Sequence, residues 1–286
     1  MSDMYLKYFT NDDGFPFCIQ YGFHEEPMFM HSHIDFFELV IVLNGTAIHI
    51  VDNERYEINK GDVFVIGNHT THGYLNTKDF KICNLMFRPD SLLSSEYDIK
   101  KAPRFHALFI IEPFITQEHN FQSKLKLHTE NFETVADMVK EMIFEYETKS
   151  IGWQTFVNSR FLELVVRLSR AYTFAANDPG GTWVSLSLPV SYMERHYLEN
   201  ININQLAERS GFSPRHFTRL FLKTYNTTPI EYIIHLRLQK ACSLLKGTRL
   251  SISEIAFQCG YNDSNYFTRQ FRKEFSLTPS EYRQSA

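Results

Sequence analysis

The stretch INQLAERSGFSPRHFTRLFLKTYNTTPIEYI, from Ile203 to Ile233, returns in altered form as ISEIAFQCGYNDSNYFTRQFRKEFSLTPSEYR, from Ile252 to Arg283. Each copy has a short amphipathic segment, a Gly-aromatic pair, a second helical segment with two phenylalanines on one face, and a closing Thr-Pro. A helix–turn–helix has this organisation, and two such units can place their second helices in successive major grooves of DNA. The repeat therefore predicts a helical, sequence-specific DNA-binding domain.

The turn of each copy carries residues suited to it. Gly211 and Gly260 stand where the chain must reverse with a positive φ, which glycine adopts without steric cost. Ser213 before Pro214 reads as an N-cap followed by a first-turn proline, and Asp263 is predicted to cap the second helix of the other copy.

The outer faces of the two second helices are predicted to read DNA. Arginine pairs with guanine, asparagine with adenine, and threonine meets a base edge or the thymine methyl group. An ordinary solvated helix face is the alternative, and the repetition of basic, Asn- and Thr-bearing faces argues against it. The predicted DNA-binding residues are Arg215, His216, Thr218, Arg219, Ser264, Asn265, Thr268 and Arg269.

The tandem unit, the helix expected over Pro229–Lys246 and the ending CGYNDSNYFTRQFRKEFSLTPSEYR resemble the DNA-binding domain of AraC/XylS transcription regulators. The resemblance begins near Leu186 and runs to the end of the chain. It implies two helix–turn–helix units bridged by a long helix, promoter DNA as a partner, and contact with RNA polymerase. Backbone amides near Asn204 and Ser253 are expected to hold phosphates.

Charge is divided unevenly along the chain, whose net charge is -4. From Val184 onward 13 Lys and Arg stand against 8 Asp and Glu, a balance of +5, which leaves -9 for the residues before it. A basic tail behind an acidic front indicates two domains with different tasks. We expect a sensing and dimerisation domain over 1–176, a linker over 177–185 that begins with the turn-rich NDPGG, and a DNA-binding domain over 186–286.

The front half is rich in short β-branched and aromatic runs between Met30 and Phe87. Turns are expected at Asn44-Gly45, Asp52-Asn53 and Lys60-Gly61, and regular short strands of this kind favour a small barrel or sandwich. The predicted fold class is thus α+β with two domains: a β-barrel followed by two helices, then an all-α tandem helix–turn–helix domain.

The spacing His31-x-His33-x4-Glu38-x6-Gly45, followed by Gly61-x5-Gly67-x4-His72-x3-Asn76, resembles both halves of the cupin signature. Gly67 and His69 depart from that pattern. The resemblance implies a double-stranded barrel open at one end to a ligand cavity.

The cupin resemblance also implies a metal set of His31, His33, Glu38 and His72. Imidazole and carboxylate ligands suit Zn, Ni, Fe or Mn without choosing among them. His31 and His33 alternate onto one strand face, but Glu38 has the opposite parity and needs a bend or bulge to join them. The alternative is a metal-free pocket lined by these residues together with His49, Tyr74 and Asn76. We interpret His24, His69 and His106 as ordinary surface or loop histidines.

Within the AraC/XylS family, the stretch HSHIDFFELVIVLNGTAIHIVDNERYEINKGDVFVIGNHTTHGY followed by FKICNLMFRP resembles the L-rhamnose regulators. The resemblance implies an activator that responds to L-rhamnose or another monosaccharide. A metal-dependent cupin enzyme fused to a DNA-binding tail, such as an oxygenase or sugar isomerase, and a metal-sensing regulator are the alternatives. No acid–base pair stands out beside the histidines, so we expect a regulator and not an enzyme.

Two amphipathic helices are expected between the barrel and the tail, over Asn131–Thr148 and Trp153–Tyr172. One face of each must cover the barrel. The second is apolar enough to leave a stripe for a partner chain, and we expect a homodimer formed through Phe161, Leu164 and Leu168. Packing within one chain is the alternative.

The four cysteines, Cys18, Cys83, Cys242 and Cys259, are scattered and form no C-x-x-C pair, which favours thiols in a reducing compartment. The sequence shows no signal peptide and no apolar run of membrane-spanning length. We therefore expect a cytoplasmic protein with no membrane partner.

Overall fold

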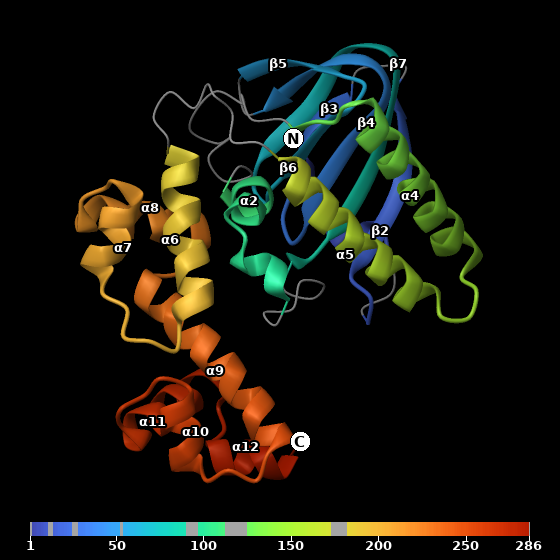
Figure 1. Cartoon of the computed structure of the whole chain (residues 1–286). Helices are drawn as coiled ribbons and strands as arrows, with labels where there is room; N and C mark the ends of the chain where they lie inside the picture. The colour runs from blue at the N-terminus through green and yellow to red at the C-terminus, as the bar shows by residue number, and fades with distance from the viewer. Residues whose placement is uncertain are drawn as a thin grey trace. The chain divides into compact units, whose positions relative to one another are not determined.

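The computed structural model describes residues 2–10, 14–24, 28–51, 54–89, 97–111, 125–172 and 182–285. The chain divides into two compact units, Met1–Trp183 and Val184–Ala286. Among the described residues the first unit is β-rich with accompanying helices and the second is helical (Figure 1). The two-domain α+β fold class is therefore confirmed. No helix among these residues is long and apolar enough to cross a membrane.

One eight-stranded sheet forms the framework of the first unit. The strands are β1 (Ser2–Met4), β2 (Phe17–His24), β3 (Met28–His33), β4 (Phe37–Val51), β5 (Glu54–Asn59), β6 (Asp62–Ile66), β7 (Thr71–Phe87) and β8 (Leu125–Lys126). Their hydrogen-bonded order is β1-β3-β7-β4-β6-β8, with β2 also paired to β7 and β5 to β4. The long strands β4 and β7 run antiparallel, from Phe37 opposite Phe87 to Val51 opposite His72.

The sheet is buried on both faces, which explains the continuous apolar run in β4. Side chains alternate across a strand, so Leu39 and Ile41 join one hydrophobic cluster while Val40 and Val42 join another. All four are fully buried. A strand with one wet face would show polar residues at every second position instead.

β4 continues through Asn44-Gly45, where we expected the chain to reverse. Gly45 has a φ of +73°, and a Cβ there would lie 2.2 Å from the carbonyl oxygen of Lys78 on β7. The glycine thus permits a local irregularity where the two long strands touch, rather than a turn. Lys60-Gly61 does separate β5 from β6, and Asp52-Asn53 lies outside the described residues.

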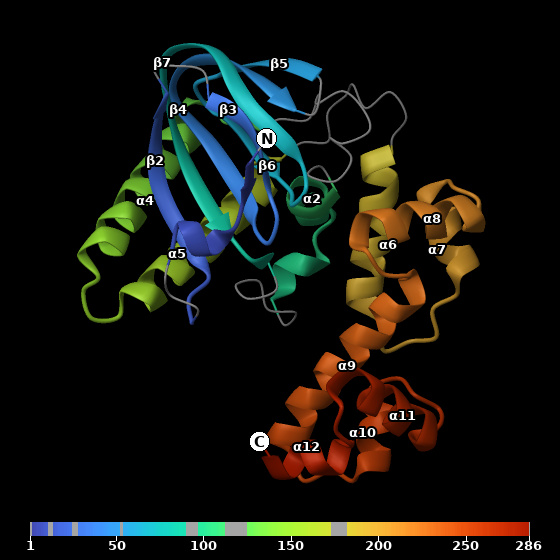
Figure 2. The same ribbon diagram turned by 180° about the vertical axis from the view of Figure 1, so that it is seen from behind.

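Two long helices cover one face of the sheet, as Figures 1 and 2 show from opposite sides. They are α4 (Thr129–Thr148) and α5 (Trp153–Ala171), close to the expected bounds. Smaller helical segments complete the first unit: η1 (Leu6–Tyr8), η2 (Asp98–Lys101), α2 (Pro103–His106) and the π-helical η3 (Ala107–Ile111). The core between the helices and the sheet joins Leu39 and Leu85 to Met138 and Val165.

The second unit is a series of helices in two groups joined by α9. They are α6 (Thr182–His196), α7 (Ile203–Ser210), α8 (Pro214–Tyr225), α9 (Pro229–Gly247), α10 (Ile252–Gln258), α11 (Ser264–Phe275) and α12 (Pro279–Ser285). The linker expected over 177–185 needs correction, because residues 182–185 already belong to α6. Its remaining part, 177–181, lies outside the described residues.

Candidate nucleic-acid interface and buried histidine site

The first candidate recognition helix is α8. The side chain of Ser213 accepts a hydrogen bond from the backbone N–H of His216, and Pro214 occupies the first turn, as expected. Phe217 and Phe221 are fully buried, which fixes the rotation of the helix about its axis. The side of α8 that carries the arginines is therefore turned outward.

The second candidate recognition helix, α11, repeats this construction. The carboxylate of Asp263 accepts a hydrogen bond of 2.8 Å from the backbone N–H of Asn265, which confirms the predicted cap. Phe267 and Phe271 are fully buried. The same burial pattern on both helices exposes the same side of each.

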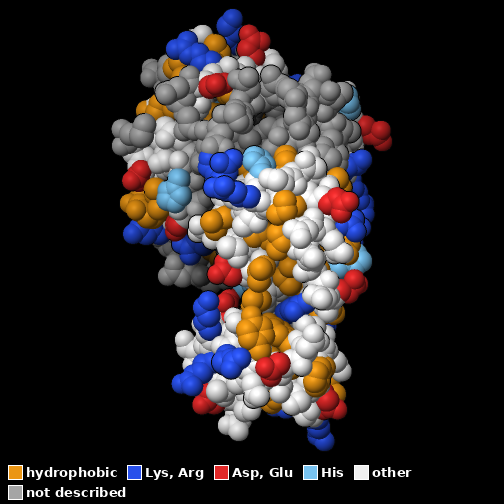
Figure 3. Space-filling model, turned by 90° about the vertical axis from the view of Figure 1, so that its left-hand side faces the viewer, with side chains coloured by type: hydrophobic (Ala, Val, Ile, Leu, Met, Phe, Trp, Pro, Cys, Tyr) orange, Lys and Arg blue, Asp and Glu red, His pale blue; other side chains and the backbone are white. Residues whose placement is uncertain are grey.

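The eight predicted DNA-binding residues lie on these outward sides with different exposure. Arg215, Arg219, Asn265 and Arg269 are exposed, whereas His216, Thr218, Ser264 and Thr268 are half-buried. The Thr268 hydroxyl donates to the Ser264 carbonyl at 2.8 Å, which leaves its oxygen lone pairs to accept a bond from a base. In the view of Figure 3, Lys and Arg side chains stand in separate groups with hydrophobic side chains between them.

Tyr266 is an exposed residue of this surface that is not among the predicted DNA-binding residues. Tyr266 is 40% exposed, and the guanidinium carbon of Arg269 lies 6.0 Å from the centre of its ring. An aromatic residue one position after Asn265 reads as core in a phenylalanine-rich segment. Phe267 and Phe271 mark the buried face of the helix, and Tyr266, one residue before Phe267, points away from that face. This offset is the sequence signal of its exposure.

The polar residues of the cupin-like motif converge inside the first unit. His31, His33 and His72 place one ring nitrogen each within 4.8 Å of one another. The Nε2 atoms of His33 and His72 are 3.2 Å apart, and they lie 3.7 Å and 3.6 Å from Oε2 of Glu38. The three histidines thus converge although His72 is distant in the sequence, and Glu38 lies beside His33 and His72.

Strand pairing explains this convergence. His31 on β3 stands directly opposite His72 on β7, and His33 follows two residues on. The chain then bends at Ile34 and Asp35, so Glu38 belongs to the separate strand β4. On one continuous strand Glu38 would face away from His31 and His33, and the predicted bend that lets it join them is therefore present.

Burial governs the charges of this cluster. It lowers the pKa of His33 to about 3 and raises the pKa of Glu38 to about 8. Burial, and then the neighbouring histidines, hold the pKa of His72 far below its usual value. At neutral pH the imidazoles are neutral and offer lone pairs, while Glu38 carries a proton that a bound cation would displace.

The surroundings orient the imidazoles as metal ligands require. Nδ1 of His31 lies 3.1 Å from the carbonyl oxygen of Phe29, to which it donates, so its Nε2 is the free acceptor. Nδ1 of His72 lies 3.4 Å from Nε2 of His49. Oε2 of Glu38 has no hydrogen bond among the described residues. These donors fit a divalent cation.

The predicted pocket residues divide into two groups. Tyr74 and His49 are buried beside the cluster, with ring centres 5.1 Å apart. Asn76 is exposed and has a φ of +52°, so the structure corrects its assignment to the pocket. Asn84 was missed. It is 7% exposed, its Oδ1 has no hydrogen bond among the described residues, and it stands opposite Val40, two residues beyond Glu38.

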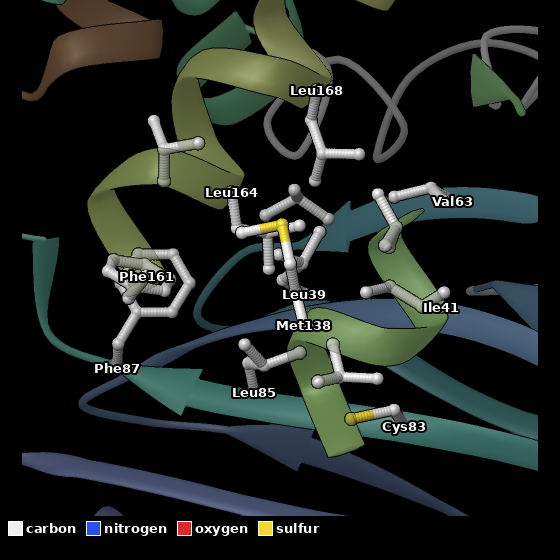
Figure 4. Packing of buried hydrophobic residues seen from close by; sticks show 14 of the residues in the cluster. Leu39, Ile41, Val63, Cys83, Leu85, Phe87, Met138, Phe161, Leu164 and Leu168 are labelled. Carbon is white, nitrogen blue, oxygen red and sulfur yellow. The ribbon is translucent and has the colours of Figure 1, made fainter. Parts of the chain in front are cut away.

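The residues expected to form a dimer surface lie in the core of the first unit. Phe161, Leu164 and Leu168 are fully buried and pack against the sheet residues Leu39 and Leu85 (Figure 4). The apolar stripe of α5 packs in the core of its own chain, so these three side chains are not available to a partner.

Comparison with known proteins matches both halves of the chain. A family model of helix-turn-helix domains covers residues 206–285 and one of cupin domains covers residues 17–87. The HTH-type transcriptional activator RhaS of Escherichia coli is 28% identical over 259 residues, which span 90% of this chain and 88% of RhaS.

Solved structures give partial matches. An AraC-type transcriptional regulator from Chromobacterium violaceum is 34% identical, covers 37% of this chain and 94% of its own, and superposes with a TM-score of 0.34. ToxT from Vibrio cholerae covers 94% of this chain and 97% of its own at 14% identity, with a TM-score of 0.35.

Proposed function

We propose that the protein activates sugar-utilisation genes when its cupin domain binds a monosaccharide. The helix-turn-helix domain, the cupin domain and the similarity to RhaS support a DNA-binding transcriptional regulator of the AraC family. L-rhamnose or a similar sugar is the effector proposed. The observation that carries the regulatory role is the pair of outward, arginine-bearing faces on α8 and α11 within one unit.

The DNA contacts proposed are Arg215, Thr218 and Arg219 in one major groove and Ser264, Asn265, Thr268 and Arg269 in the next, with His216 beside the first group. Arg215→Ala and Arg269→Ala should each weaken specific binding by about 1–3 kcal/mol and relax sequence preference in one half of the site. The two relaxed positions should lie about 10–10.5 base pairs apart.

The duplex for this test is one selected by the wild-type protein from a randomised library, and binding is followed by fluorescence anisotropy and footprinting. Lys240→Ala is the matched control, because Lys240 is exposed on α9 and lies outside both recognition helices. Unchanged affinity and footprint in both arginine variants would show that the outward faces do not read DNA.

For the first unit we propose that His31, His33 and His72, with Glu38, hold a divalent cation and that the sugar binds beside it. A bound cation would supply an electrophile for two sugar hydroxyl groups. The support is a converging, buried donor set that lies beside a hydrophobic cluster of the sheet. His49 and Tyr74 flank the same cluster, and Asn84 lies on the same face of the sheet as Glu38. All three side chains can hydrogen-bond a sugar.

Metal analysis of the purified protein tests this site. We expect near-stoichiometric Zn, Ni, Fe or Mn, its loss in His72→Ala, and its retention in His69→Asn, which replaces an exposed histidine at a positive φ. The metal-free variant should also unfold at a lower temperature, because a ligand that binds only the folded state stabilises it. Metal affinity should fall as the pH drops below about 8, because a proton on Glu38 then competes with the cation, whereas burial keeps the His33 imidazole neutral down to about pH 3.

Calorimetric titration with L-rhamnose and other monosaccharides, with and without EDTA, separates the competing roles. Sugar binding that EDTA abolishes supports the cation as an anchor, and sugar binding that survives EDTA rejects it. Metal-dependent DNA binding with no response to any sugar would indicate a metal sensor. The second candidate, a metal-dependent enzyme, is favoured by the same buried His and Glu donors, and conversion of the titrated sugar into product would establish it.

We also propose a homodimer that contacts RNA polymerase at its promoter. With Phe161, Leu164 and Leu168 inside the core, the outer surfaces of α4 and α5 are the surface proposed for the dimer. Phe144 is 63% exposed there, Phe156 is 38% exposed, and Ile151 between the helices is fully exposed. Sedimentation of the wild type against Phe144→Ser and Ile151→Ser tests the assignment.

A further inference from the structure

A short loop between α6 and α7 is held by residues from the second helix–turn–helix unit and from the connecting helix. Arg237 on α9 donates from Nε to the carbonyl oxygen of Tyr197 at 2.6 Å and from Nη2 to that of Glu199 at 2.7 Å. The planar guanidinium matches two carbonyls better than a point charge such as an ammonium. The side chain of Arg237 therefore binds the loop 197–199 at both of its ends.

The same guanidinium reaches the second helix–turn–helix unit. Its carbon lies 5.5 Å from the ring centre of Tyr261, which is 3% exposed and follows the turn between α10 and α11. Burial lowers the pKa of Arg237. The guanidinium is half-buried, so its hydrogen bonds are charge-assisted and partly shielded from water, and its loss would leave two carbonyls without this donor.

Gly260 completes the contact from the other side of the loop. A Cβ at this position would lie 2.4 Å from the carbonyl oxygen of Leu198 and 3.0 Å from its carbonyl carbon. Gly211, the equivalent turn glycine of the first unit, has nothing within 4 Å of the same point, although φ is positive at both, +78° and +70°. Gly211 is needed only for its own turn. Gly260 also permits the loop 197–199 to approach the second helix–turn–helix unit closely.

We infer that the loop 197–199, Arg237 and Gly260 form a junction that sets the separation and rotation of α8 relative to α11. Arg237 is thus a positioning residue: it touches no base and determines which spacing of the two half-sites the protein accepts. The helix α9 is the covalent connection between the two groups of helices, and the junction adds non-covalent contacts to it. The inference rests on the proposed reading of two successive grooves.

The test uses the full chain and a duplex that the wild-type protein selects from a randomised library, together with derivatives that have one base pair inserted or deleted between the half-sites. The wild type should prefer the selected spacing. In Arg237→Gln the ratio of affinities for selected and altered spacing should fall about tenfold, the effect of losing one or two hydrogen bonds to a charged group. In Arg237→Lys the ratio should fall less, because the charge remains but the fork is lost.

Matched controls separate this role from charge and from folding. Lys240→Gln removes the same charge from an exposed position on α9 and should leave the spacing ratio unchanged. Gly260→Ala should lower the ratio, whereas Gly211→Ala, with the same backbone strain and no clash, should not. A general loss of folded protein lowers binding to every duplex by one factor and leaves the ratio intact.

An Arg237→Gln protein that loses affinity equally for all spacings, or keeps the wild-type ratio, overturns the junction while the two-groove reading stands. A wild-type protein indifferent to spacing overturns both. If Arg237→Gln does not fold, the ratio in Arg237→Lys decides, and a wild-type ratio there rejects the junction.

Discussion

At the scale of single residues, His106 shows how far burial can depart from what a local sequence suggests. We expected an ordinary surface or loop histidine, but it is 2% exposed and its Nε2 donates to the carbonyl oxygen of Lys100 at 2.6 Å. Burial lowers its pKa to about 3. The apolar residues around it in PRFHALFII fit a buried segment, but they do not show that the histidine itself is buried, because its neighbours Phe105 and Ala107 pack in a core with residues far away in the sequence.

The lowered pKa makes His106 a source of acid sensitivity. Its folded pKa lies below the unfolded value of 6.5, so its contribution to stability is full above pH 6.5 and is lost as the pH falls toward 3. Over the middle of that window the loss should approach about 1.4 kcal/mol per pH unit. His106→Gln, which keeps an N–H for Lys100, should remove this component of the pH dependence.

Urea unfolding of both proteins between pH 7 and pH 4.5 measures the difference. His69→Asn serves as the control, because His69 is exposed and its replacement should leave the pH dependence as in the wild type. Equal slopes for wild type and His106→Gln would mean that His106 is already protonated or hydrated in the folded protein.

At the scale of elements, α5 illustrates why an amphipathic stripe does not reveal its partner. The stripe of Phe161, Leu164 and Leu168 fits a partner helix and a sheet equally well, since both offer apolar surface. The structure assigns it to the sheet, where Leu164 has no exposed surface. The expected interface residues are thus core residues.

Leu164→Ala should therefore lower the free energy of unfolding of the first unit by about 2–5 kcal/mol, the cost of a cavity in a packed core. Subunit association of the folded protein should not change. Phe156→Ala, on the same helix but 38% exposed, should do the reverse: little loss of stability and weaker association. Chemical denaturation and sedimentation velocity distinguish the two, and a stable monomer from Leu164→Ala would restore the original interface.

At the scale of the whole molecule, the uneven charge predicts that the first unit opposes binding to DNA that lacks the operator. Glu130, Glu133 and Glu147 are exposed, and replacing all three with glutamine removes three of the negative charges behind the -9 of the front half. Non-specific affinity should rise roughly two- to fivefold at low salt, because repulsion from phosphates weakens. The gain should vanish toward 1 M salt, where the screening length is about 3 Å.

Fluorescence anisotropy with a duplex of unrelated sequence measures this effect across a salt series. Replacing the exposed Lys140 and Lys149 with glutamine should change affinity in the opposite direction. A gain that persists at high salt would point to a change in structure and not to charge.

The sequence by itself determined the features that depend on neighbours along the chain. The N-caps Ser213 and Asp263, the positive φ of Gly211 and Gly260, and the buried faces of α8 and α11 follow from local backbone chemistry and helical period. The bounds of α4, α5 and α9 follow for the same reason. The fold class and the DNA-binding role rest on such local signals, repeated twice.

The tertiary structure alone decided which surfaces meet. It turned Leu164 inward, left Asn76 exposed, placed Asn84 on the same face of the sheet as Glu38, and continued β4 through Asn44-Gly45. Each outcome depends on strand register or on packing between residues far apart in the sequence. A hydrophobic pattern predicts that one face of an element is buried, but it does not predict which other element covers that face, because the hydrophobic effect is not directional.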